Sequence, residues 1–200
     1  MHDGRAQRLQ GALRRQQVLR TAAVVFAKTG LHGTTTQALA EAMGVSEPVL
    51  YLHFRSKEAL FREAVERNIE TRLRNLDEGL GRIIVRGRSE AIRAMAEETV
   101  LDYVREPGHA VLTTWALLEA PEYALDLYRH EVSAVVTMWR RLLDNRPAAE
   151  FIPHAVEMCL AHGLWLAVLR LTAESAAPLA RQFAGDVVRM AMAHPARLRP

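Results

Sequence analysis

GVSEPVLYLHF, residues 44–54, predicts a short helix with apolar side chains on two opposite faces. At 100° per residue, Leu50 and Phe54 lie on one face, while Pro48 and Leu52 point almost directly away from it. Burial against a core explains one apolar face and leaves the other unexplained. The rest of the chain must therefore supply a reason for an apolar surface that stays outside.

Both ends of this segment carry residues that favour a helix boundary. Ser46 is the expected N-cap, with its hydroxyl accepting from the first free backbone N–H groups. Glu47 places a carboxylate at the positive end of the helix dipole, and a proline such as Pro48 is tolerated in the first turn. Gly44 supplies the positive φ that a sharp turn before the helix needs.

The composition is that of a soluble globular protein of one or two domains, with 200 residues, half of them hydrophobic and 24% charged. The single cysteine, Cys159, excludes an intrachain disulfide and fits a reducing cytoplasm. The chain does not open like a signal peptide. Its longest apolar stretch, residues 151–169, contains His154, Glu157 and His162, and we expect it to be too polar for a membrane span.

Charge is distributed unevenly along the chain. Residues 1–60 carry eight Arg and Lys against four Asp and Glu, which leaves them at +4 and the remainder at −1. A basic segment on a near-neutral body suggests a part that binds a polyanion. An ordinary solvated surface explains the same charge about equally well.

The pattern along the chain predicts an all-α fold of about nine helices. Strand-like alternation is absent, and Gly and Pro separate segments of helical periodicity. The first helix is expected over 12–29, and Thr35 or Thr36 caps a second, short one that ends at Gly44. After the helix in 44–54, Ser56 caps a long amphipathic helix ending near Gly81. Further helices are expected at about 89–105, 108–119, 122–145, 149–173 and 175–193.

The second and third helices have about eight residues each and are joined by MGVS, a spacing typical of a helix-turn-helix at about 35–54. Ala40 is small enough for the two helices to cross closely. In this motif the second helix enters the major groove of DNA. Its outward apolar side chains can then contact thymine methyl groups, which explains the second apolar face of residues 44–54.

Residues 30–61, GLHGTTTQALAEAMGVSEPVLYLHFRSKEALF, strongly resemble the N-terminal domain of the TetR family of bacterial transcriptional repressors. The paired threonines, the Gly-Val-Ser turn, the Leu-Tyr-x-His-Phe run and the Ser-Lys-Glu start of the fourth helix carry the resemblance, which covers roughly residues 12–65. It implies a DNA-binding domain at 1–58, with a three-helix head, and a helical ligand-binding and dimerisation domain at 59–200. The expected function is that of a cytoplasmic, homodimeric, ligand-responsive regulator, a repressor on a pseudo-palindromic operator.

The resemblance also implies which residues face DNA. Thr36 would contact a phosphate, Gln37 a base, and Lys57 a phosphate. The full set is Thr35, Thr36, Gln37, Ser46, Glu47, Pro48, Val49, Tyr51, Leu52, His53 and Lys57. Two of these residues are unusual: many relatives carry Arg or an aromatic residue in place of Leu52, and the Glu47 carboxylate is repelled by phosphate, so that a cytosine amino group is the base donor it suits.

Aromatic and methionine side chains of the remaining chain are candidates for an apolar effector pocket, although burial in the core is the simpler explanation for most of them. The candidates are Met95, Tyr103, Trp115, Tyr123, Met138 and Trp165. The effector would then be a largely hydrophobic small molecule. The last helices are apolar and rich in small residues, which fits an intersubunit four-helix bundle or burial within one subunit. The candidate interface residues are Leu179, Phe183, Val187 and Met190.

No nucleophile elbow, P-loop, GxGxxG or HExxH motif is present in the sequence, and we expect no enzymatic activity and no cofactor or metal. The alternative to a DNA-binding regulator is a helical small-molecule sensor or interaction protein that no longer binds DNA. Leu52 and Glu47 are the only residues that favour this alternative.

Overall fold

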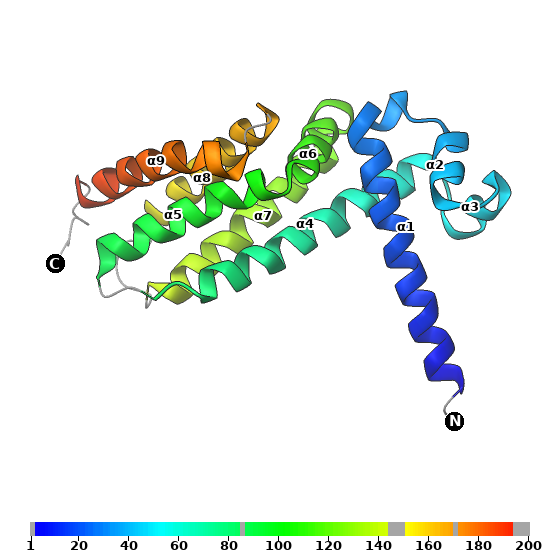
Figure 1. The fold of residues 1–200 in the computed structure, drawn as a ribbon, viewed down its shortest axis with the longest axis horizontal. Helices are drawn as coiled ribbons and strands as arrows, with labels where there is room; N and C mark the ends of the chain where they lie inside the picture. Colours follow the sequence, from blue (N-terminus) through cyan, green and yellow to red (C-terminus); the bar gives the residue numbers. More distant parts are fainter. Residues whose placement is uncertain (1–2, 85–86, 144–150, 170–171, 194–200) are drawn as a thin grey trace. The chain divides into compact units, whose positions relative to one another are not determined.

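The computed structural model describes residues 3–84, 87–143, 151–169 and 172–193. Within these residues the chain forms nine helices and no strand, which confirms the predicted all-α fold (Figure 1). Their bounds are α1 Asp3–Gly33, α2 Thr36–Met43, α3 Glu47–His53, α4 Lys57–Gly81, α5 Arg88–Arg105, α6 Pro107–Glu119, α7 Pro121–Leu142, α8 Phe151–Val168 and α9 Ala173–Ala193. The predicted helix ends at 145 and 149 lie outside the described residues. The predicted end of the eighth helix at 173 is wrong, because α8 ends at Val168 and α9 already begins at Ala173.

The chain divides into two compact units. Unit 1 contains Met1–Glu70 and Val111–Ala124, and unit 2 contains Thr71–Ala110 and Leu125–Pro200. The division that we predict from sequence, a DNA-binding domain at 1–58 and a helical domain at 59–200, remains a prediction.

The core of unit 1 is built by α1, α2, α3 and the first half of α4. Phe26 and Phe61 meet edge to face, with ring centroids 5.0 Å apart. Leu39, Leu50 and Leu60 are buried with them. Because α2 and α3 are short, these contacts rather than the helices themselves hold them in place.

The first helix departs from prediction at both ends. It begins at Asp3 instead of residue 12, and it is broken rather than ended at Gly30, where φ is +72° and a further helical turn follows. The carboxylate of Glu119, at the end of α6, accepts from the Leu31 backbone N–H at 2.5 Å. A Cβ placed on Gly30 would lie 2.7 Å from both Glu119 and the Trp115 ring, so that the break depends on a glycine.

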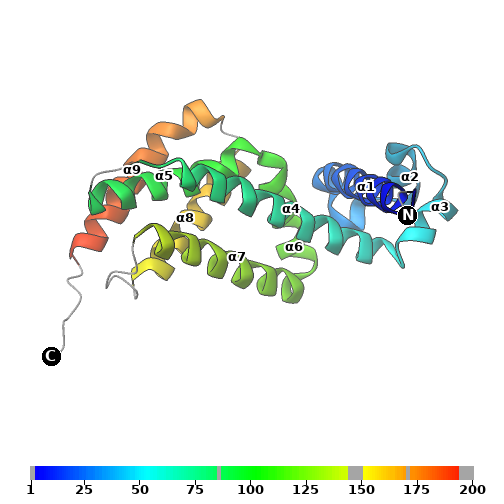
Figure 2. The ribbon, with the colours of Figure 1, turned by 90° about the horizontal axis from the view of Figure 1, so that it is seen from below.

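Unit 2 is organised around α5, against which α8 and α9 pack (Figures 1 and 2). Gly163 of α8 allows a close approach, because a Cβ there would lie 2.7 Å from the Val100 carbonyl oxygen of α5. Cys159 is fully buried, and burial raises the pKa of its thiol. This packing makes α8 part of the interior of unit 2.

Among the described helices, α8 is the one that is long and apolar enough to cross a membrane by length and composition, with a mean hydropathy of 1.3 over 18 residues. Composition alone therefore does not exclude a span for residues 151–169, although we expected its polar residues to do so. The core helix of a soluble protein has the same composition, and α8 buries Ile152, Val156 and Leu160 within this chain.

We predict that Gly30→Ala destabilises the protein more than Gly44→Ala. Both glycines have a positive φ, at +72° and +67°, but only Gly30 has side chains within 4 Å of an added Cβ. Gly44, with ψ at 32°, is in the left-handed conformation, which costs an alanine about 1–2 kcal/mol. Gly30, with ψ at −171°, is in a region that is essentially restricted to glycine, so its backbone cost is at least as large. Overpacking against Trp115 and Glu119 should add about 1 kcal/mol or more. Urea unfolding followed by circular dichroism measures the difference, and equal losses would show that the two side chains move aside freely.

Candidate nucleic-acid interface

Local sequence positions α2 and its turn. The Thr35 hydroxyl accepts from the Ala38 backbone N–H at 3.1 Å, so Thr35, and not Thr36, is the N-cap of α2. Gly44 ends the helix in the left-handed conformation, and the Val45 N–H donates to the Ala40 carbonyl at 3.0 Å. The prediction of a capped short helix that ends at Gly44 is confirmed.

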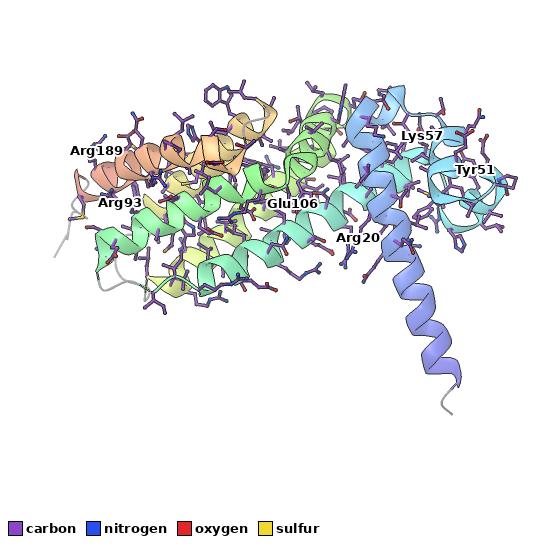
Figure 3. All side chains as sticks on the ribbon, viewed as in Figure 1. Arg20, Tyr51, Lys57, Arg93, Glu106 and Arg189 are labelled. Atoms are coloured by element: carbon purple, nitrogen blue, oxygen red, sulfur yellow. The ribbon has the colours of Figure 1, made fainter. Side chains whose placement is uncertain are left out.

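The third helix has the orientation that its periodicity predicts. Leu50 and Phe54 are each 4% exposed, while Leu52 is 80% exposed on the other side. Tyr51 and Val49 are also exposed, and Figure 3 labels Tyr51 on α3. The outward apolar face of α3 is therefore present in the folded chain.

The predicted capping role of the Ser46 side chain is wrong. Ser46 occupies the N-cap position of α3, but its hydroxyl makes no capping hydrogen bond. An N-cap side chain accepts from the N–H of the second or third helical residue; Pro48, the second, has no N–H, and the N–H of Val49, the third, does not donate to Ser46. The exposed Ser46 hydroxyl therefore carries no capping hydrogen bond in the chain.

Lys57 has a partner within the chain that the sequence does not reveal. Its Nζ donates to the Thr34 carbonyl oxygen at 2.8 Å, so that it joins the start of α4 (Figure 3) to the residue before the Thr35 cap. Ser56 caps α4 as predicted, with Oγ accepting from the Ala59 N–H at 3.1 Å. The ammonium has three donors, so its contact with Thr34 is compatible with a phosphate contact, which stays a prediction.

The unusual Glu47 is hydrogen-bonded to a second predicted DNA contact. Thr36 Oγ1 donates to Glu47 Oε2 at 2.5 Å, across the turn between α2 and α3. On α2, Gln37 Nε2 donates to Glu41 Oε1 at 3.0 Å. Two side chains expected to meet DNA are thus engaged with carboxylates in the described chain. These contacts depend on side-chain orientation and are not visible in sequence spacing.

Part of the basic charge of residues 1–60 is used inside unit 1. Arg15 forms an ion pair with Glu63, and its guanidinium lies 5.0 Å from the centre of the Phe54 ring. Arg15 therefore helps to hold α1 against the end of α3. The side chains of Thr35, Pro48 and His53 are exposed.

The six pocket candidates do not lie in one unit. In unit 2, Met95 and Tyr103 are fully buried, Met138 is half-buried and Trp165 is 57% exposed. In unit 1, Trp115 lies against Gly30, and Tyr123 donates through its hydroxyl to the Arg62 carbonyl at 2.8 Å. A shared effector pocket for these residues stays a prediction.

The interface candidates on α9 differ in exposure. Leu179 and Met190 are exposed, whereas Val187 is fully buried within the chain. The Phe183 ring stacks on His162 of α8, with centroids 4.2 Å apart and planes 5° from parallel. Leu179 and Met190 are thus the candidates that a second subunit can reach directly.

Sequence reasoning missed a buried group of polar residues in unit 2, centred on Arg72 of α4. A signal was available, because Arg72 lies beside Leu73 on the apolar face of α4, between Ile69 and Leu76. Within the described residues, no group of three or more His, Cys, Asp or Glu side chains is placed to hold a metal ion.

Comparisons with known proteins agree with this geometry. Residues 18–64 match the model of the family described as bacterial regulatory proteins, tetR family. The chain is 48% identical over 48 residues to the tetracycline repressor protein class C of Escherichia coli, an alignment that spans 24% of this chain and 22% of that protein. It is 39% identical over 66 residues to the transcriptional activator FasR of Mycolicibacterium smegmatis, spanning 33% and 30%. The matches thus span about a third or less of these curated relatives.

Solved structures extend the likeness of fold beyond the head. A TetR-family transcriptional regulator from Mesorhizobium loti superposes with a TM-score of 0.72 at 16% identity, covering 91% of this chain and 96% of that one. A cysteine mutant of the TetR family transcriptional regulator CifR, in a structure with 26 bp double-strand operator DNA, superposes with a TM-score of 0.64 at 25% identity, covering 85% and 95%.

An all-α chain with a helix-turn-helix head and a helical body is the architecture of a class of bacterial regulators. Residues 18–64 of this chain match that class through the model of bacterial regulatory proteins of the tetR family, and the described fold is that of solved TetR-family regulators. The matched relatives are named as transcriptional regulators and not as enzymes.

We predict that Glu47→Gln increases affinity for all DNA duplexes by several-fold. The hydroxyl proton of Thr36 is donated to Glu47, so a phosphate can accept it only after that contact breaks. The carboxylate also repels phosphate, by about 0.2–1 kcal/mol at an exposed site. Gel shifts with an operator and with unrelated DNA measure the change.

Thr36→Val separates the two effects, because it removes the hydroxyl and leaves the Glu47 charge. In the Thr36→Val background, Glu47→Gln should gain less affinity than in the wild type, since only the charge effect remains. A Glu47→Gln variant that lost affinity only at duplexes with one particular cytosine would contradict competition for Thr36 and assign Glu47 to a base contact.

Proposed function

We propose that this chain is a DNA-binding transcriptional regulator that represses genes from a pseudo-palindromic operator. The observation that carries the proposal is the outward face of α3, with Leu52 80% exposed while Leu50 and Phe54 anchor the helix. An apolar side chain that stays in water on a seven-residue helix suits contact with thymine methyl groups in a major groove. The operator complex of CifR supports the proposal by similarity of fold.

The contacts with DNA that we propose divide into phosphate and base contacts. Thr35, Thr36, Tyr51, His53 and Lys57 would contact the phosphate backbone and fix the position of α3. Base edges would meet Gln37, Ser46, Glu47, Pro48, Val49 and Leu52. Because most contacts go to phosphate, affinity should fall steeply with salt.

We infer that the active form is a homodimer, since two related half-sites require two heads related by a twofold axis. The described part of unit 2 exposes large apolar side chains on its last two helices and the residue that follows α8. They are Trp165, Val168, Leu169, Leu179, Met190 and Met192. An apolar surface of this kind in a soluble protein marks an interaction site.

We further propose that a small-molecule effector binds the helical body and releases DNA in the cytoplasm. A ligand that favours one conformation of the body changes the population that binds the operator. The alternative, a sensor that no longer binds DNA, is favoured only by Leu52 and by the carboxylate of Glu47 at the start of α3.

The proposal is tested with the full chain and the DNA upstream of its own gene. We predict a retarded complex whose affinity falls steeply between low and moderate salt. Leu52→Ala should change the preference at one base pair in each half-site by about 1 kcal/mol, because a methyl contact is lost. Val24→Ala, which shortens an exposed side chain on α1, is the matched control and should leave the preference unchanged. Absence of any complex would favour the alternative of a sensor that does not bind DNA. An unchanged base-pair preference in Leu52→Ala would contradict the proposed contact between Leu52 and a base.

We predict that Leu179→Glu yields a folded monomer with reduced operator affinity. Leu179 is exposed, so a charge there leaves the chain's own core intact, but an unpaired carboxylate in an apolar interface is unfavourable. Ile84→Glu introduces the same charge at the 94% exposed Ile84 and should stay dimeric. Light scattering gives the mass of both variants, and a dimeric Leu179→Glu would place the interface elsewhere.

A further inference from the structure

Four polar side chains from α4, α5 and α7 meet in the interior of unit 2, and we call them the Arg72 cluster: Arg72, Asp102, Tyr103 and Glu131. Arg72 Nη1 donates to Asp102 Oδ2 at 2.5 Å, and Arg72 Nη2 forms an ion pair with Glu131 Oε1. The Tyr103 hydroxyl donates to the same Glu131 oxygen. The ion-paired side chains are 2%, 7% and 1% exposed in the order Arg72, Asp102 and Glu131.

The charges of the Arg72 cluster do not balance. One guanidinium faces two carboxylates, which leaves one negative charge in excess when both are ionised. Burial raises the pKa of Asp102 to about 6, against the opposing charges of Arg72 and Arg105, so Asp102 is still mostly ionised at neutral pH. Arg105 is itself paired with Glu98, so it leaves the excess negative charge in place. Burial, together with the charge of Arg72, lowers the pKa of His109 to about 4, so His109 adds no positive charge.

One oxygen of the Arg72 cluster has no donor. Glu131 Oε1 accepts from both Arg72 and Tyr103, whereas Glu131 Oε2 is buried without a hydrogen-bond partner among the described residues. A buried acceptor without a donor is unfavourable, and more so when it is charged. The unsatisfied atom and the excess charge therefore coincide at Glu131.

A role in joining the helices does not require this arrangement. The pair of Arg72 and Asp102 alone would be neutral and would already join α4 to α5. The Tyr103 ring also packs on Arg72, with the guanidinium carbon 4.2 Å from the ring centre. Glu131 adds a second buried carboxylate, which stabilises the fold only when its charge is compensated.

The part of α7 that follows Glu131 is apolar, whereas Tyr128, one turn before it, lies close enough for the charge of Glu131 to raise the pKa of its hydroxyl, after burial and Glu157. Val135 and Trp139 follow Glu131 at four-residue intervals on α7, and both are buried. Trp139 Nε1 donates to Thr99 Oγ1 of α5 at 3.2 Å, so this face of α7 is held against α5. A group that reached Glu131 Oε2 would therefore have apolar side chains beside one carboxylate oxygen.

We propose that unit 2 binds an amphiphilic organic cation, an apolar body with a primary ammonium or amidinium group whose N–H donates to Glu131 Oε2. The cation supplies both the missing donor and the missing positive charge. Its role as effector rests on the proposed function above, and it adds a cationic head group to the largely hydrophobic small molecule that the sequence suggests. The residues that recognise it are Glu131, through the hydrogen bond, and Asp102, through the charge balance of the cluster.

Calorimetric titration of the full chain with three matched probes tests the proposal at pH 7.5. 4-Phenylbutylamine, 4-phenylbutan-1-ol and 4-phenylbutyrate share one apolar body and differ in the head group. We expect the amine to bind at least tenfold more tightly than the alcohol, and the carboxylate to bind most weakly. An amine that bound no more tightly than the alcohol would overturn the proposal.

Two variants assign the preference to the Arg72 cluster. Glu131→Gln removes the excess charge at nearly constant shape, and Asp102→Asn does the same while leaving Glu131 in place. Each variant should reduce the ratio of amine affinity to alcohol affinity at least fivefold. Glu122→Gln, at an exposed position on α7, should leave this affinity ratio unchanged. Circular dichroism checks folding, and if one variant fails to fold the other decides. A ratio that survives in the folded variants would place the amine elsewhere and overturn the assignment.

Failure of this proposal and failure of the proposed function give different results. The titration needs no DNA. If the chain binds the amine through Glu131 but binds no operator, the cation site is supported and the proposed regulatory function is contradicted. If the chain binds its operator but shows no preference for the amine, the regulatory function is supported and the cationic ligand is contradicted. Release of the operator by 4-phenylbutylamine in the wild type but not in Glu131→Gln would support both.

Discussion

The head depends on one constraint, which is that a helix of seven residues is not stable by itself. Tertiary packing must supply the stability of α3, and Leu50 and Phe54 supply it by burial. Once these two side chains are fixed inward, the helical repeat leaves no freedom for Leu52, which must face solvent. The outward direction of Leu52 is thus a consequence of the same packing that makes the helix form, whereas its apolar character is not. Arg15, lying over the Phe54 ring and paired with Glu63, extends this packing to α1 and α4.

The features that sequence predicts here are those decided by neighbours along the chain. Thr35 and Ser56 cap the helices that follow them, because an N-cap side chain reaches only two or three residues ahead. Gly44 ends α2 for an equally local reason, its access to a positive φ. The apolar repeat of α4 likewise predicts its buried face, including Leu73. Ser46 occupies the N-cap position of α3 without a capping hydrogen bond, although the N–H of Val49, the third helical residue, is present.

The features that sequence does not predict join residues far apart in the chain. Lys57 donates to Thr34, 23 residues earlier, and Glu119 accepts from Leu31, 88 residues away. Neither a lysine nor a glutamate indicates such a contact in the sequence. The sequence suggests that Lys57, in the first turn of α4, contacts a phosphate, whereas in the structure it donates to the Thr34 carbonyl oxygen. Arg72 was predictable in part, since an arginine within an apolar stripe must find partners. Which carboxylates those are depends on how α5 and α7 pack against α4.

The contact between Thr36 and Glu47 and the contacts of the Arg72 cluster differ in how much an added charged partner changes the free energy of the folded chain. Thr36 and Glu47 lie at an exposed turn, where water screens charges and a hydrogen bond exchanges at little net cost. The Arg72 cluster is buried, so adding or removing one charge there changes the free energy of the folded state far more. One continuous helix, α4, carries both Lys57 and Arg72. A ligand that compensates the Arg72 cluster in only one conformation of that helix would change operator affinity, and operator DNA would change the affinity for that ligand by the same factor.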